Sequence, residues 1–168
     1  MIPDTEGLTK VHIDLPKHWW FKGESLWAKE LGDDLYEIQN VPFCAYGLNC
    51  LDVVHAIADA ADLKPEIRSV VRRSGNQTAR LFFDDEFTRE QQQPYLDKVT
   101  SMGAWTERAN QSVVCVNIPA SANYQNLCNY FAQLEVEEVL DFETCEERAP
   151  GSFDDLPEDE NVSRDEPP

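Results

Sequence analysis

Carboxylates dominate the side chains of this sequence that could do chemistry, because 32 of its 168 residues are Asp or Glu. Adjacent pairs such as Asp33-Asp34 and Asp84-Asp85 have the residue types that an acid and base pair requires. In a chain this acidic, however, such pairs are expected by chance. The pairs alone therefore do not indicate catalysis, and the acidity is better interpreted as a property of the surface.

The three histidines and five cysteines form no recognisable catalytic or metal-binding motif. His12, His18 and His55 do not lie in a setting typical of a triad, although triad members need not be adjacent in sequence. Cys44 and Cys50 are farther apart than the close cysteine pairs of zinc sites. We therefore expect no metal and no cofactor. An odd number of cysteines without a paired framework favours reduced thiols in a cytoplasmic protein.

Basic residues are concentrated at Arg68, Arg72, Arg73 and Arg80. Alternation along strands could place some of them on one solvent-exposed face. Binding nucleic acid would require a locally positive surface in a chain whose formal net charge is −18. Pairing with neighbouring carboxylates is the favoured interpretation, and we expect no nucleic-acid partner.

The negative charge is concentrated toward the C-terminus. From Glu135 onward there are 14 acidic residues against two arginines, so this stretch carries 12 of the 18 excess negative charges. No segment approaches the roughly 18 consecutive apolar residues of a membrane span, and the first twenty residues contain acids instead of an apolar signal core. We expect a basic partner and no membrane partner.

Two helices and a series of strands are expected to position these groups. The capping-box pattern of Thr88 to Gln91 predicts a helix to Met102, and apolar residues at three- and four-residue steps predict another at 124–135. The segment 52–61 could be a helix, or a strand leading into one. Turn residues predict two hairpins, one around Gly32-Asp33-Asp34 and one around Ser74-Gly75-Asn76. Strands are expected at 11–15, 25–31, 35–41, 66–73, 78–83, 104–107, 112–118 and 139–142.

This order of elements predicts an α+β fold. We expect a mainly antiparallel sheet with N-terminal β-hairpins, a ferredoxin-like (split βαβ) C-terminal half, and helices on one face. Residues 1–149 would form one domain, with a possible β-rich half at 8–63 and a ferredoxin-like half at 66–145. Residues 150–168 are rich in Pro and acids and predict a flexible acidic tail.

A resemblance to a known family is carried by several short segments. They are Glu24, Leu26 and Trp27, then residues 40–43 (NVPF), 47–54 with Asp52, and 70–75 (VVRRSG), with the likeness continuing to Glu143. On these residues the chain resembles the bacterial family called domain of unknown function 4265. That family has no established activity, so the resemblance implies domain limits and no mechanism. We expect the matching residues to have structural roles more than functional ones, since Trp27 and Phe43 would anchor a sheet face.

The leading hypothesis is an acidic binding protein that neutralises a basic partner, such as an immunity protein blocking a cognate toxin nuclease. One alternative is a small enzyme built on His12, His55 and a carboxylate. Another is an adaptor or regulatory protein that docks through its acidic tail. The expected partner-binding residues are Asp33, Asp34, Glu37, Trp20, Glu135, Glu137, Glu138 and Asp141.

Overall fold

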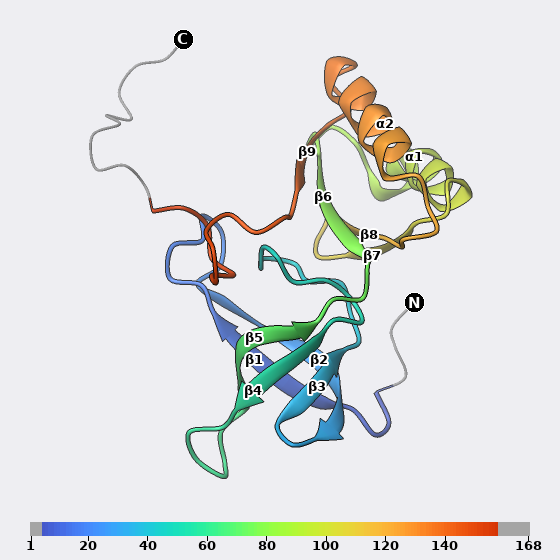
Figure 1. The fold of residues 1–168 in the computed structure, drawn as a ribbon. Coiled ribbons are helices and arrows are strands. Elements are labelled where there is room, and N and C mark those ends of the chain that lie inside the picture. The colour runs from blue at the N-terminus through green and yellow to red at the C-terminus, as the bar shows by residue number, and fades with distance from the viewer. Residues whose placement is uncertain (1–4, 158–168) are drawn as a thin grey trace.

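The computed structural model describes residues 5–157 and shows two β-rich units joined by a short connection (Figure 1). The N-terminal unit is a closed barrel with its strands in sequence order. A parallel contact between His12 and Glu66 closes the barrel between its first and last strands. Its strands are β1 (Thr9–Asp14), β2 (Gly23–Gly32), β3 (Leu35–Ile38), β4 (Val53–Ile57) and β5 (Glu66–Arg72).

Alternating side chains build the interior of the barrel. On β1, Val11 and Ile13 are buried whereas Lys10, His12 and Asp14 are more exposed, because successive side chains of a strand point to opposite faces. The strands β2, β3, β4 and β5 contribute further buried residues to the same core. The barrel therefore has its own apolar core.

The hairpin between β2 and β3 confirms the first turn that the sequence predicts. Asp33 and Asp34 have φ values of 56° and 59° and lie in the left-handed region. Two consecutive residues of this kind make the two-residue turn that suits the right-handed twist of paired strands. The turn lies at the end of the barrel that points away from the second unit (Figure 1).

The C-terminal unit is a four-stranded sheet in the order β7-β8-β6-β9, and every neighbouring pair in it is antiparallel. Along the chain its elements follow the order strand, helix, strand, strand, helix, strand. They are β6 (Gln77–Phe83), α1 (Arg89–Ser101), β7 (Trp105–Arg108), β8 (Val113–Ile118), α2 (Tyr124–Val136) and β9 (Leu140–Thr144).

Both helices cover the face of this sheet that is turned away from the barrel (Figure 1). The predicted capping box at the start of α1 is present: the Thr88 hydroxyl accepts the Gln91 N–H, and the Gln91 side chain accepts the Thr88 N–H. Leu127, Phe131 and Leu134 of α2 pack against Leu81 and other buried residues of the sheet. In the described part of the chain, neither helix has the length and apolarity needed to cross a membrane.

The α+β class is confirmed, but the expected single sheet is replaced by two sheets. The second predicted hairpin is wrong: β5 pairs with β4 and β1 in the barrel, whereas β6 pairs with β8 and β9. Residues 74–76 do contain turn residues, but they connect the two units. Turn signals are local and do not reveal which strands pair across a long stretch of chain. The ambiguous segment 52–61 contains the strand β4.

The segment that follows β9 returns to the barrel. Phe153 packs against the barrel core, and the Asp154 carboxylate accepts the Lys17 N–H at 2.8 Å. Both residues lie within the stretch 150–168, which the sequence predicts to be a tail. Residues 158–168 of that tail lie outside the described residues.

Candidate functional site

The barrel and the sheet meet through the loop of residues 39–52, which connects β3 to β4. Arg80, on β6, is 1% exposed and reaches this loop from the sheet. Its guanidinium donates to the carbonyls of Cys44 and Ala45 at 3.0 and 3.2 Å, and to the Glu143 carboxylate at 2.8 Å. Because all of these acceptors lie within hydrogen-bonding distance, the buried charge is compensated.

Glu24, on β2, holds the same loop from the barrel. One of its carboxylate oxygens accepts the N–H groups of Cys44 and Ala45 at 2.9 and 2.8 Å, and the other accepts that of Phe43 at 2.9 Å. The loop therefore gives its N–H groups to an anion of the barrel and its carbonyls to a cation of the sheet. This clamp fixes how the two units sit against each other.

Two further contacts join the loop to the sheet. Glu107, on β7, accepts the Val41 N–H at 3.3 Å, and burial raises the pKa of this carboxyl group. Thr78, on β6, donates its hydroxyl hydrogen to the Asn49 side chain at 2.7 Å. Both contacts are internal to the junction, so they contribute to assembly of the fold.

Tyr46 is fully buried at the centre of the junction. Its hydroxyl donates to Glu143 at 3.0 Å and accepts the indole N–H of Trp19 at 3.4 Å. The guanidinium groups of Arg80 and Arg148 lie 4.8 and 4.5 Å from the centre of its ring, within range of cation–π attraction. The tyrosine therefore links the barrel segment at residue 19 to β6 and β9.

His18 is buried beside Tyr46 and is held as a neutral ring. Its Nδ1 atom accepts the N–H groups of Trp20 and Phe21 at 3.0 and 3.2 Å, so the hydrogen of the neutral ring lies on Nε2. Burial, together with the Arg80 charge, lowers the pKa of His18. This histidine serves to order the segment 18–21.

The buried cysteines are not activated as nucleophiles. Burial raises the pKa of the Cys44, Cys50 and Cys145 thiols to about 12 and that of Cys115 well above its ordinary value. A thiol in this state is a poor nucleophile, because the thiolate is the reactive form. Among the described residues, no group of three or more His, Cys, Asp or Glu side chains is arranged to hold a metal ion.

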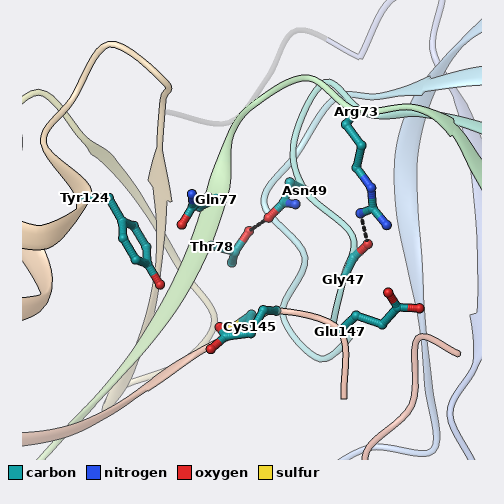
Figure 2. A pocket seen from close by; sticks show the side chains of 9 residues that line it. Gly47, Asn49, Arg73, Gln77, Thr78, Tyr124, Cys145 and Glu147 are labelled. Atoms are coloured by element: carbon teal, nitrogen blue, oxygen red, sulfur yellow. Dashed lines mark hydrogen bonds between the residues drawn. The ribbon is translucent and has the colours of Figure 1, made fainter. Parts of the chain in front are cut away.

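A cavity of about 310 Å³ lies beside the junction (Figure 2). Arg73 donates to the Gly47 carbonyl at 2.5 Å within it, and the contact between Thr78 and Asn49 lies on its wall. Burial raises the pKa of Tyr124 to about 12, so this phenol and the Cys145 thiol stay protonated at neutral pH. The lining residues are Gly47, Asn49, Arg73, Gln77, Thr78, Tyr124, Cys145, Glu146 and Glu147.

A second and larger hollow, of about 710 Å³, is strongly acidic, and we call it the acidic groove. Three segments line it: the end of β6 with the turn after it, the C-terminal part of α2, and the start of β9. The lining contains no Lys or Arg, and none of its carboxylates forms an ion pair with a described residue. Its lining residues are Phe82, Phe83, Asp84, Asp85, Glu86, Phe87, Glu135, Glu138, Leu140 and Asp141.

Exposed aromatic rings lie next to this groove. Trp19 is 54% exposed and Phe21 is 51% exposed, although both are large apolar side chains. The Trp19 ring contacts Phe82 edge to face, with 5.7 Å between ring centres, and Phe82 lines the groove. The groove and the segment 18–21 therefore share a border.

In a comparison with protein families, residues 24–142 match the family model described as Domain of unknown function (DUF4265). The chain belongs to this family. The matched range includes Glu24, Arg80 and all the groove carboxylates, and it begins after the exposed rings. A comparison with curated proteins found no match.

A solved structure shares the fold of this DUF4265 protein. It is titled "Novel crystal structure of a hypothetical protein from Neisseria gonorrhoeae". Its sequence is 17% identical, the TM-score is 0.68, and the similarity covers 82% of this chain and 95% of that one. At this identity the likeness shows the fold alone.

The structure of this family member separates the acidic residues that the sequence singled out. Glu135, Glu138 and Asp141 come together in the groove, and Glu137 is exposed beside them at the end of α2. By contrast, Asp33, Asp34 and Glu37 belong to the β2–β3 hairpin and line none of the hollows described above.

Among the consecutive aromatics, the exposed rings are Trp19 and Phe21, whereas Trp20 is partly buried against the barrel core. The pair Asp84-Asp85, which by itself did not indicate a site in the sequence, lines the groove opposite α2 together with Glu86. Three adjacent acids at the end of an apolar strand were the available signal. The sequence around these three acids does not show that they lie close to Glu135, Glu138 and Asp141.

Proposed function

We propose that this protein binds and neutralises a basic protein partner through the acidic groove. The observation that carries the proposal is the set of six groove carboxylates, contributed by three separate segments, with no basic side chain among the lining residues. A cationic surface placed there would find ionised oxygens that no cation of the described structure already occupies. The total charge of −18 would add long-range attraction to the same partner.

The groove carboxylates are suited to guiding and orienting such a partner. Asp84, Asp85, Glu86, Glu135, Glu138 and Asp141 are all exposed in the free protein. Exposed, complementary charges speed encounter and set orientation more than they set final affinity. Affinity would then come from apolar contacts next to the charges, such as the partly exposed Phe82 and Phe87 in the wall of the groove.

A toxin nuclease is the partner class that we propose. Proteins that bind nucleic acid carry clustered Lys and Arg, because most of the affinity comes from phosphate contacts. A row of carboxylates can occupy the same cationic surface in place of the phosphates. The protein would then act in the cytoplasm as an immunity protein, and no reactive group of its own would be needed.

We also propose that the C-terminal unit has ferredoxin-like topology. Its elements follow the order strand, helix, strand, strand, helix, strand, and the first and third strands lie at the centre of an antiparallel sheet. This is the arrangement expected of a split βαβ unit. The groove would then lie at one end of that sheet, where β6 ends and β9 begins.

A charge-matched pair of variants tests the groove. Glu135→Gln/Glu138→Gln/Asp141→Asn removes three groove charges, whereas Asp33→Asn/Asp34→Asn/Glu37→Gln removes three charges from the hairpin. The partner to titrate is the purified product of the neighbouring open reading frame, by calorimetry at low salt. We expect the groove variant to bind at least about tenfold more weakly and the hairpin variant to stay within about twofold. Equal losses, or no binding by the unmodified protein, would overturn the proposal.

A truncation tests the competing hypothesis of an adaptor that docks through its tail. Removing residues 158–168 leaves Phe153 and Asp154, which contact the barrel. If the groove is the docking surface, the truncated protein keeps its affinity for the same partner apart from a modest salt-dependent loss. Complete loss of binding would favour the adaptor.

A further inference from the structure

The barrel presents two exposed aromatic rings at the border of the acidic groove. Trp19 and Phe21 lie on the segment between β1 and β2, and Trp20 between them packs on the barrel core. Ring centres along this segment are 5.9 Å apart for Trp19 and Trp20, and 4.6 Å apart for Trp20 and Phe21. Exposed apolar patches of this kind commonly mark interaction surfaces.

The register of the sheet places a groove carboxylate next to the phenylalanine that Trp19 contacts. Phe82 of β6 is directly opposite Asp141 of β9, so the two side chains lie on the same face. Trp19 contacts that same Phe82 ring, with 5.7 Å between ring centres. An aromatic face and an exposed carboxylate therefore border one phenylalanine.

We propose that Trp19 and Phe21 extend the groove into a surface that prefers arginine side chains of the basic partner, a proposal that rests on the function proposed above. A guanidinium can stack on an indole face while its N–H groups donate to a carboxylate at the edge of the ring. Asp141 supplies a carboxylate beside Phe82. A lysine ammonium satisfies the carboxylate equally well but stacks less effectively, because it is a compact and strongly hydrated charge.

Trp19 is held in place before any partner arrives. Its indole N–H donates to the Tyr46 hydroxyl at 3.4 Å, and its ring stacks on His18 with 5.4 Å between centres. The segment is anchored further by the bond from the Lys17 N–H to Asp154. An aromatic ring that is exposed but already ordered loses little conformational entropy on binding.

The charges around the rings select a cationic partner over a second copy of this chain. Trp19 contacts Phe82, which lines the groove. The Arg80 charge acts on the neighbouring His18, but Arg80 is paired with Glu143 at 2.8 Å, and the charges of Glu143, Asp155 and Asp154 act on His18 in the opposite sense. Lys17 and Lys22, on the same segment between β1 and β2, would repel a cationic ligand. The Lys22 ammonium, however, already donates to the His18 carbonyl at 3.0 Å. A second copy would bring another net charge of −18 to the same place.

The test uses an oligo-arginine and an oligo-lysine peptide of equal length, titrated into the full chain by calorimetry at low salt. We expect the arginine peptide to bind about fivefold more tightly. The substitution Trp19→Leu should remove that preference and leave the lysine peptide unaffected, whereas Trp19→Phe should retain part of it. Trp105→Leu is the matched control, since Trp105 is also exposed, at 42%, on the edge strand β7.

The outcomes separate this inference from the proposed function. If both peptides bind equally and Trp19→Leu changes nothing, the groove binds cations but the rings do not select arginine, and the inference is overturned. If neither peptide binds, both the groove and the inference fail. Sedimentation of the unmodified chain and of Trp19→Leu provides a second measurement: a dimer that the substitution abolishes would assign the rings to a second copy and overturn the inference.

Discussion

The junction and the acidic groove contain the same kind of side chain in opposite electrostatic states. At the junction, Glu24 accepts three N–H groups and Glu143 accepts donors from Arg80 and Tyr46. In the groove, six carboxylates face solvent without an ion pair to any described residue. Asp84, Asp85 and Glu135 of the groove each accept one hydrogen bond from the described residues, so the two regions differ in burial, in ion pairing and in the number of donors that reach each carboxylate.

This difference predicts opposite responses to the same substitution. A carboxylate whose oxygens are filled by N–H donors stabilises the fold, and its neutralisation leaves those donors unsatisfied. An exposed carboxylate that lies among other negative charges destabilises the fold by repulsion, and neutralising that carboxylate reduces the repulsion. The comparison can therefore be tested by measuring stability alone, before any partner is identified.

The largest effect is expected at Arg80. Arg80→Met keeps a long apolar side chain but leaves the Glu143 carboxylate and the carbonyls of residues 42, 44 and 45 without this donor. Removing one partner of a buried ion pair costs about 3–5 kcal/mol. Urea unfolding should show a loss of that size, whereas Arg72→Met, at an exposed site on β5, should change the unfolding free energy little. A loss at Arg80 no larger than the loss at Arg72 would contradict the junction as described.

A smaller loss is expected at Glu24. In Glu24→Gln one acceptor oxygen becomes an amide NH₂ group that faces N–H donors of residues 43–45. Losing charge-assisted hydrogen bonds of this kind costs roughly 1.5–3 kcal/mol. Hydrogen exchange should accelerate at those three backbone amides. The control is Glu30→Gln, which is exposed on the same strand and should leave both measurements unchanged.

Neutralising the groove should have the opposite sign and a smaller size. Glu135→Gln/Glu138→Gln/Asp141→Asn removes three like charges that lie close to Asp84, Asp85 and Glu86. We expect the melting temperature to rise at low salt, and the gain to shrink as salt screens the remaining charges. A decrease in melting temperature would show that these carboxylates hold the fold together, and the contrast with the junction would be lost.

Local patterns in the sequence predict most of the elements. The capping box at Thr88, the apolar spacing of α2 and the turn at Asp33-Asp34 each depend on residues within a few positions of one another, and each is present in the structure. The junction depends instead on partners far apart in the chain. Arg80 contacts Glu143 from 63 residues away, and nothing in the alternation along β6 indicates that its arginine is buried.

The same limit explains how the groove was predicted only in part. Glu135, Glu138 and Asp141 form a visible cluster in the sequence, and they line one side of it. The opposite side, Asp84 to Glu86, approaches them because β6 and β9 are neighbours in the sheet. The pairing of β6 with β9 is a property of the topology, so an acidic run at the end of one strand cannot reveal it.

The smallest effect concerns how stability depends on pH at His18. Burial lowers the pKa of this histidine in the folded protein, so between that lowered value and 6.5 the unfolded chain binds more protons than the folded one. The contribution of His18 to stability is therefore complete above pH 6.5 and is lost as the pH falls through the folded-state pKa. In His18→Asn the side chain can still accept an N–H group but does not titrate, so the unfolding free energy should fall less steeply between pH 7 and pH 5. If His18→Asn keeps the slope of the unmodified protein, the buried ring does not control this part of the pH dependence.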